Sequence, residues 1–158
     1  MVSSTDGVSA ISVPSGFAPL PVMGPFDHSV APLYWRRNDP EFTLGMGVEQ
    51  RHCNLQDILH GGALATFVDI AMGCTVRVAN GGHVRCVTAT MTLDFIGRVS
   101  AGDWIEARGQ VLRVGKRLVY VHCLVWNADE CIARASGSFA PVGVWAEIPD
   151  AHIFGPRE

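Results

Sequence analysis

The sequence predicts an α+β fold in which a curved antiparallel sheet wraps around one long central helix. A single segment, residues 61–78, is apolar on every side and carries only two charged residues. Four long β-rich segments follow it, separated by short breaks. A helix that is apolar all round must be surrounded by protein, and short breaks favour antiparallel strands. The strands are therefore expected to enclose the helix.

The elements follow one another without an internal repeat. Two short extended segments, 31–37 and 42–50, are separated by turn-forming residues and predict a hairpin. The central helix comes next. The four later strands are expected at residues 84–96, 104–114, 117–126 and 131–140, each beside its neighbour in sequence.

The length and composition fit one domain. The chain has 158 residues, of which 48% are hydrophobic, so it can bury a real core. Residues 1–30 mix Ser, Gly and Pro without a sustained period and are expected to form a flexible N-terminal arm. We assign residues 31–145 to the domain and residues 146–158 to a C-terminal tail.

Charge and hydropathy restrict the partners. With 12 Lys and Arg against 15 Asp and Glu, the net charge of −3 supplies no basic field for nucleic acid. Charged residues make up only 17% of the chain, and the mean hydropathy is +0.22. Such a composition predicts a buried interface between subunits.

The cysteines and the N-terminus indicate a cytoplasmic protein. Five cysteines, an odd number without a Cys-x-x-Cys pair, fit a reducing compartment. Residues 1–6 lack the basic start of a signal peptide. The most apolar stretch, residues 61–76, contains Asp69 and is shorter than the roughly 18 uncharged residues of a membrane span, so no span is expected. The pairs His52-Cys53 and His122-Cys123 point their side chains apart, so no metal site is expected.

Asp69 lies in the middle of the apolar helix. A buried carboxylate is costly unless it is paired, hydrogen-bonded or protonated. One interpretation is structural: Asp69 caps strand amides or pairs with Arg77 or Arg85. The other is that it performs chemistry.

The start of the helix predicts an oxyanion site. His60-Gly61-Gly62 opens it, and glycine lets another group approach the free N–H donors of the first turn, where the helix dipole favours negative charge. Asn54 adds an amide nearby that does not titrate. The alternative is that the two glycines serve only close packing.

The spacing between these two features predicts two chains at one site. Asp69 is eight residues beyond Gly61, which separates the two Cα atoms by about 12 Å along the helix. A carboxylate at that distance cannot act on an atom held at its own helix start. If both serve one reaction, they come from antiparallel helices of a homodimer with composite sites.

These residues resemble a known family. Asn54, His60-Gly61-Gly62 and Asp69, with the strand Cys86–Phe95 and Gly102-Asp103, are similar to the hotdog-fold acyl-CoA thioesterases of the phenylacetate-pathway (PaaI-like) type, over residues 45–142. The resemblance implies a hotdog fold, an acyl-CoA substrate, no cofactor besides the substrate's coenzyme A, and a homodimer that forms a dimer of dimers.

The resemblance also implies roles. The Gly61 N–H would polarise the thioester carbonyl while the partner's Asp69 acts as nucleophile or general base. Asn54 would position the thioester or water, and Thr88 would hold that water. Alternation along the strand places Thr88 on the face of Thr90 and Thr92, opposite Leu93, so an exposed threonine face is the alternative.

Further residues are candidates for binding the substrate. His60 and Gly62 would support the turn and contact the ligand. Thioesterases of this kind bind coenzyme A phosphates with surface cations, and the turn residues that could do so are Arg98, Arg113, Lys116 and Arg117. Solvated turns are the alternative for these cations.

The sequence departs from the family at two places. Asp57 stands where relatives commonly have Gly before His-Gly-Gly, so a non-glycine residue would have to adopt a positive φ. Gly97-Arg98-Val99 replaces a proline-containing turn, which would alter the pocket mouth. Two other functions stay open: an acyl-CoA sensor without turnover, and a hotdog enoyl-CoA hydratase or dehydratase using His60 with Asp69.

Overall fold

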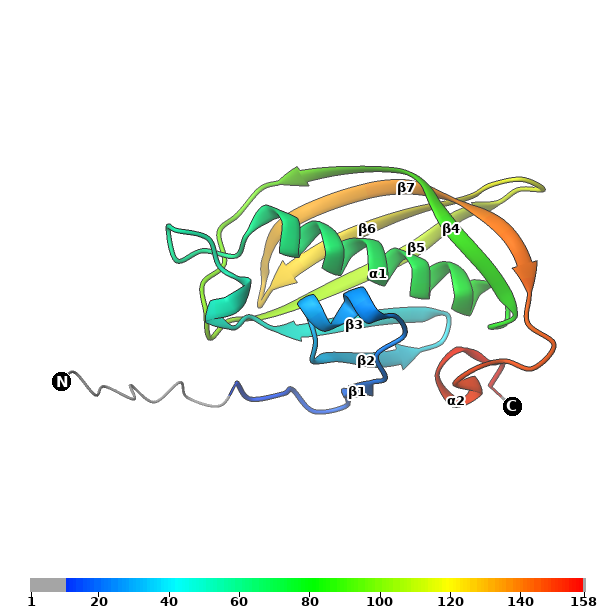
Figure 1. Ribbon diagram of the computed structural model, residues 1–158, viewed down its shortest axis with the longest axis horizontal. Helices are drawn as coiled ribbons and strands as arrows, with labels where there is room; N and C mark the ends of the chain where they lie inside the picture. Colours follow the sequence, from blue (N-terminus) through cyan, green and yellow to red (C-terminus); the bar gives the residue numbers. More distant parts are fainter. Residues whose placement is uncertain (1–10, 158) are drawn as a thin grey trace.

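The computed structural model describes residues 11–157 and shows one antiparallel sheet bent around a central helix (Figure 1). The sheet has seven strands in the order β1-β2-β3-β5-β6-β7-β4. The strands are β1 (Ala18–Leu20), β2 (Leu33–Asn38), β3 (Glu41–Gly47), β4 (Val84–Phe95), β5 (Trp104–Val114), β6 (Val119–Asn127) and β7 (Glu130–Val144). The helices are α1 (Gly61–Ala79) and α2 (Ala151–Phe154), with 3-10 turns η1 (Pro25–Ser29) and η2 (Gln50–His52).

The central helix forms the core, as the sequence predicts. Helix α1 packs against β3, β4, β5, β6 and β7, and Phe67, Val68 and Met72 are fully buried between helix and sheet. With 19 residues it is longer than expected, and by length and composition alone it could cross a membrane. Its contacts with five strands identify it as the core helix of the domain.

The strand order differs from the expectation that each strand lies beside the next. Strands β5, β6 and β7 do form consecutive hairpins, because residues 115–118 and 128–129 are tight connections. Strand β4 instead pairs with β7 at the far edge of the sheet. The connection over residues 96–103 is long enough to cross the end of the sheet, so β4 and β5 are not neighbours.

A register shift between Thr88 and Thr90 changes which side chains of β4 face the helix. Cys86 faces the core before the shift, whereas Met91 and Leu93 face it afterwards. Strict alternation, which placed Thr88 opposite Leu93, is therefore wrong. The extra residue of a bulge exchanges the two faces, so Thr88 and Leu93 both point toward α1.

The ends of the chain pack more tightly than a flexible arm and a tail would. Residues 11–30 contain β1 and η1, and Leu20 and Val30 are buried in the core; residues 1–10 lie outside the described residues. At the other end Ile153 and Phe154 are buried, and the Arg37 guanidinium donates to the carbonyl oxygens of Ile153 and Gly155.

Candidate active site

The loop before α1 presents Asn54 through a tight turn. The Asn54 Oδ1 accepts the N–H of Gln56 at 2.8 Å, and the Asn54 N–H donates to the carbonyl of Ile58. Asp57 has a φ of 57°, which confirms the positive φ expected there. Gln50 Nε2 donates to the Asp57 carboxylate at 2.7 Å and so holds this residue. The Asn54 Nδ2 has no partner in the described part of the chain and remains available to a ligand.

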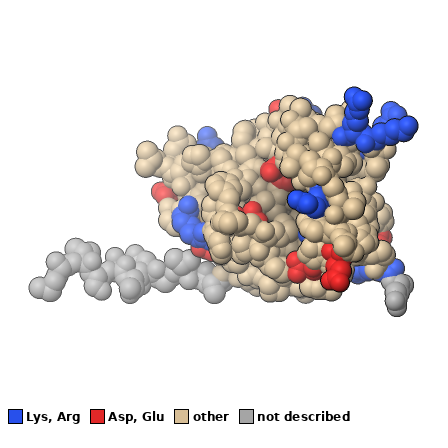
Figure 2. All heavy atoms as spheres, turned by 45° about the vertical axis from the view of Figure 1, so that its right-hand side comes forward, with Lys and Arg blue, Asp and Glu red and all other residues tan. Residues whose placement is uncertain are grey.

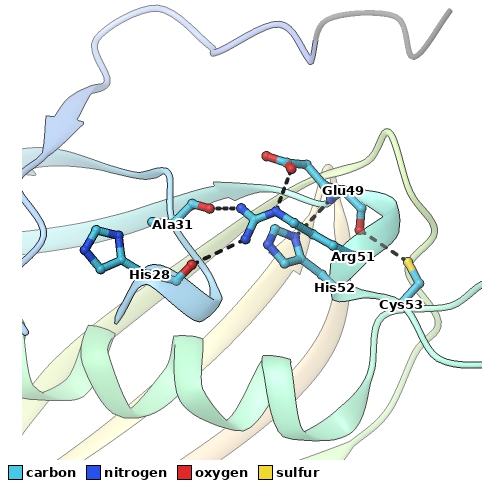
Figure 3. A network of polar contacts seen from close by, with 6 residues as sticks. All are labelled: His28, Ala31, Glu49, Arg51, His52 and Cys53. Carbon is cyan, nitrogen blue, oxygen red and sulfur yellow. Dashed lines mark hydrogen bonds and ion pairs between the residues drawn. The ribbon is translucent and has the colours of Figure 1, made fainter. Parts of the chain in front are cut away.

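A polar network fixes the segment in front of this loop (Figure 3). Arg51 donates to Glu49 at 2.8 Å and to the carbonyl oxygens of His28 and Ala31, which ties η2 to the N-terminal segment. The N–H of Glu49 donates to Nδ1 of the buried His52. The carbonyl of His52 in turn accepts the N–H of His60, so the network sets the start of α1. Sequence reasoning missed these supporting residues because the contacts of Arg51 with His28 and Ala31 span 23 and 20 residues, while the local contacts depend on side-chain rotamers.

His52 should make the folded protein sensitive to mild acid. Burial lowers the pKa of His52 below 6.5, and its Nε2 has no partner to stabilise a charge. The unfolded chain then binds a proton near pH 6.5 that the folded chain rejects. We expect the free energy of unfolding to fall as the pH drops below 6.5, until the lowered pKa is passed.

Urea unfolding at several pH values, on wild type and His52→Asn, measures this effect. The Asn side chain can keep an acceptor for the Glu49 N–H but cannot take up a proton in this range. The Glu49 pKa is lowered mainly by its hydrogen bond to Arg51, so that carboxylate contributes only below 4.5. Equal pH dependence of the two proteins between pH 6.5 and 4.5 would contradict the prediction.

His60 caps α1 and changes the predicted set of oxyanion donors. Its Nδ1 accepts the N–H of Gly62 at 2.8 Å, so that donor is not free for an anion. The Gly61 N–H has no hydrogen-bond partner among the described residues. Because Nδ1 accepts, the neutral His60 ring carries its proton on Nε2. Of the two glycine N–H groups at this helix start, the geometry therefore leaves that of Gly61 free.

Gly61 opens onto a small cavity of about 240 Å³. Asn54 and Arg98 line the same cavity beside Phe95, so the structure brings the predicted site residues Gly61, Asn54 and Arg98 together at the helix start. A Cβ at Gly61 would lie 3.3 Å from the Phe95 ring. The glycine therefore keeps this approach to the backbone open, as expected for an oxyanion site.

Asp69 is held by Thr88 and by neither arginine. The Thr88 hydroxyl donates to Asp69 Oδ1 at 2.7 Å. In the described part of the chain, no ion pair joins Asp69 to Arg77 or Arg85. The structural interpretation through these arginines is therefore wrong. One carboxylate oxygen is fixed by Thr88, and Oδ2 has no hydrogen-bond partner among residues 11–157.

Asp69 and Thr88 line a second cavity of about 710 Å³. This cavity shares no residue with the one at Gly61. A third cavity, lined by His60 and Asn54, also excludes Asp69. Within one chain, Asp69 therefore lies in a different cavity from Gly61 and from His60. A further cavity of about 800 Å³ lies at the β2–β3 turn and contains no candidate catalytic residue.

The predicted phosphate-binding cations are split between two places. Arg98 lies at the Gly61 cavity. Arg113, Lys116 and Arg117 lie on the β5–β6 hairpin, which projects at the opposite end of the molecule from the start of α1 (Figure 1). Figure 2 shows basic side chains gathered at the corner where this hairpin projects. Within one chain these cations do not meet Arg98. Among the described residues no cluster of His, Cys, Asp or Glu could hold a metal ion.

Known proteins are similar to this chain in sequence and in fold. The thioesterase superfamily model matches residues 56–132, which include the start of α1, Asp69 and β4. Over these residues, just under half of the chain, the sequence is similar to the thioesterase superfamily. A Pseudomonas aeruginosa protein with a provisional esterase name is 28% identical over 82% of this chain and 97% of its own length.

Two further proteins are similar to this chain, one in sequence and one in fold. Acyl-coenzyme A thioesterase 13 of Mus musculus is 34% identical over 48% of this chain, a match that spans 53% of the mouse protein. The PaaI protein of the E. coli phenylacetic acid degradation operon has a TM-score of 0.67 at 21% identity, covering 75% of this chain and 85% of that one. The hotdog fold is thereby confirmed.

Proposed function

We propose that this protein is an acyl-CoA thioesterase that hydrolyses its substrate in composite sites of a homodimer. The observation that carries the proposal is the separation of the candidate catalytic groups along α1. The unpaired Gly61 N–H lies at one cavity, and the Asp69 carboxylate, which Thr88 holds, lies at another. Two antiparallel copies of α1 would place each Gly61 opposite the partner's Asp69.

Two unpartnered surfaces support such a dimer. Strand β4 is a twelve-residue edge strand, and long open edges normally acquire a partner. The side of α1 that carries Asp69 and Gly73 is only partly covered in one chain. If β4 pairs with its own copy around a twofold axis, the sheets become continuous and the helices lie antiparallel. The same axis would carry the partner's β5–β6 hairpin toward Arg98, and a dimer of dimers would bury further apolar surface.

The reaction follows from these positions. The thioester oxygen would accept the Gly61 N–H, which stabilises the negative charge of the tetrahedral intermediate. The partner's Asp69 would take a proton from a water molecule whose oxygen attacks the carbonyl carbon. When the carbon–sulfur bond breaks, the thiolate of coenzyme A recovers that proton and the acid leaves. The Asn54 amide and the Thr88 hydroxyl would orient the water and the carboxylate.

The same geometry allows a covalent route. Asp69 Oδ2 would attack the carbonyl carbon and release the coenzyme A thiolate, which takes a proton from water. Water would then hydrolyse the mixed anhydride between the acyl group and Asp69, restoring the carboxylate. In both routes His60, which is exposed, caps the helix through Nδ1, and its Nε2–H would be available to the substrate. The five free thiols suit work in a reducing compartment such as the cytoplasm.

The test is thiol release from a panel of aryl and aliphatic acyl-CoAs, with binding measured on the same samples. We expect saturable binding accompanied by release of coenzyme A. Saturable binding without thiol release would favour the sensor, and water addition to an enoyl-CoA would favour the hydratase. Either result would overturn the thioesterase proposal.

A further inference from the structure

Arg77 lines the cavity of Asp69 at its far end. Its side chain is largely buried, with the residue 8% exposed. The guanidinium lies 4.5 Å from the centroid of the Trp145 ring and 3.9 Å from that of Phe154. Nε donates to the carbonyl of Gly82 at 3.2 Å, and Nη2 donates to the carbonyl of Pro149. The third nitrogen, Nη1, has no hydrogen-bond partner in the described residues.

This cation has no anionic partner in the described chain. None of the ion pairs among residues 11–157 includes Arg77. Asp150 also lines the cavity and lies near enough to favour the charged form, yet it is beyond ion-pair distance. Two backbone carbonyls and two rings hold the guanidinium in place, but they do not neutralise it. A buried cation without a counter-charge is costly, and an anion entering the cavity would offset that cost.

The lining between Asp69 and Arg77 is mainly apolar. Ile70, Cys74 and Phe139 contribute side chains, and Gly73 leaves room for a chain to pass. The two ends are eight residues apart on α1, or about 12 Å along its axis. The end of the molecule that carries the C-terminal half of α1 comes forward in Figure 2, where the surface is hollowed.

We infer that this cavity selects acyl groups of medium length that end in a carboxylate. The inference rests on the proposed function, because the thioester end must lie beside Asp69. The methylene chain would follow the apolar lining, and the terminal carboxylate would accept from Nη1 of Arg77. A short acyl group would hold its carboxylate near Asp69, where like charges repel. The thiols of Cys74 and Cys86, which also face this space, stay neutral because burial raises their pKa.

Matched pairs of substrates test the inference directly. Adipoyl-CoA is compared with hexanoyl-CoA, and suberoyl-CoA with octanoyl-CoA, by kcat/KM and by equilibrium binding to the intact protein. A charge-assisted hydrogen bond predicts a preference of about 10-fold or more for the carboxylated member. Hydrolysis with preference for the plain acyl group overturns the inference and leaves the thioesterase proposal standing. If no thioester is hydrolysed, the proposed function fails, and the binding ratio still decides whether the cavity selects a carboxylate.

Variants locate the preference. Arg77→Met removes the charge and should abolish the preference, whereas Arg77→Lys should keep part of it. Arg85→Met, a matched loss of an exposed arginine from β4, should leave the ratio unchanged. Because both substrates are measured on the same sample, partial unfolding of a variant cancels in the ratio. An unchanged ratio in folded Arg77→Met would overturn the inference, and so would a wild-type ratio of one.

Discussion

Asp69→Asn is expected to lower turnover by at least ~10²-fold, the scale typical of a lost acid or base. The amide keeps the shape of the side chain, and its oxygen can still accept the Thr88 hydroxyl. It can neither take a proton from water nor attack as a carboxylate does. Thiol release under saturating substrate, measured beside the melting temperature, checks this result. Substrate binding should persist.

Asp94→Asn is the matched control for this variant. Asp94 lies on β4 and is exposed, with its carboxylate bound to Arg134 on the outer face. Its replacement should leave turnover close to that of the wild type, because it touches neither cavity. Turnover of folded Asp69→Asn as high as that of the control would rule out a catalytic Asp69.

Gly61→Ala should cause the second large loss. The variant keeps the backbone N–H but adds a methyl that would lie 3.3 Å from the Phe95 ring, in the cavity where the thioester oxygen must approach. Losing one oxyanion donor typically costs about 3 kcal/mol in the transition state, equivalent to ~10²-fold in rate. Phe95 is largely exposed and can move, so the melting temperature should change little.

A double variant distinguishes two causes of this loss, displacement of the substrate and displacement of the Phe95 ring. Gly61→Ala combined with Phe95→Leu removes the contact between the methyl and the ring. If the methyl displaces the thioester, the double variant stays as slow as Gly61→Ala. Full recovery in the double variant, or intact turnover in the single one, would show that the glycine serves packing and that Asn54 is the next candidate donor.

The sequence predicts the helix and the four later strands well because their periods are long and strong. The end of α1 and both ends of β5 agree with the expected segments within about one residue. The position of β4 beside β7 could not be predicted, because strand order depends on pairing between residues distant in sequence. The register shift after Thr88 could not be predicted either, because no Gly or Pro marks its position in the strand.

The candidate site, like the fold, could be predicted from the sequence only in part. The positive φ of Asp57 followed from a resemblance at one position, and the structure confirms it. The capping of Gly62 by His60 required the rotamer of the histidine, which a sequence does not specify. The rise per residue of a helix was enough to predict that Gly61 and Asp69 lie apart. The structure agrees, because the two residues line separate cavities.

Mixing two inactive chains tests most directly whether each active site combines residues of two chains. Asp69→Asn lacks the carboxylate, and Asn54→Ala lacks the amide at the helix start, so each homodimer should be inactive. A mixed dimer would pair the intact Asn54 of one chain with the intact Asp69 of the other. Asn54→Asp is a second choice for the partner, because its carboxylate can still accept the Gln56 N–H and keep the turn.

Both chains are unfolded together, refolded and separated by different affinity tags, and thiol release is measured on the mixed species. If each site combines residues of two chains, activity returns in the mixed dimer, with one of its two sites intact. If native mass spectrometry shows that mixed dimers form and they release no thiol, the two-chain active site is contradicted.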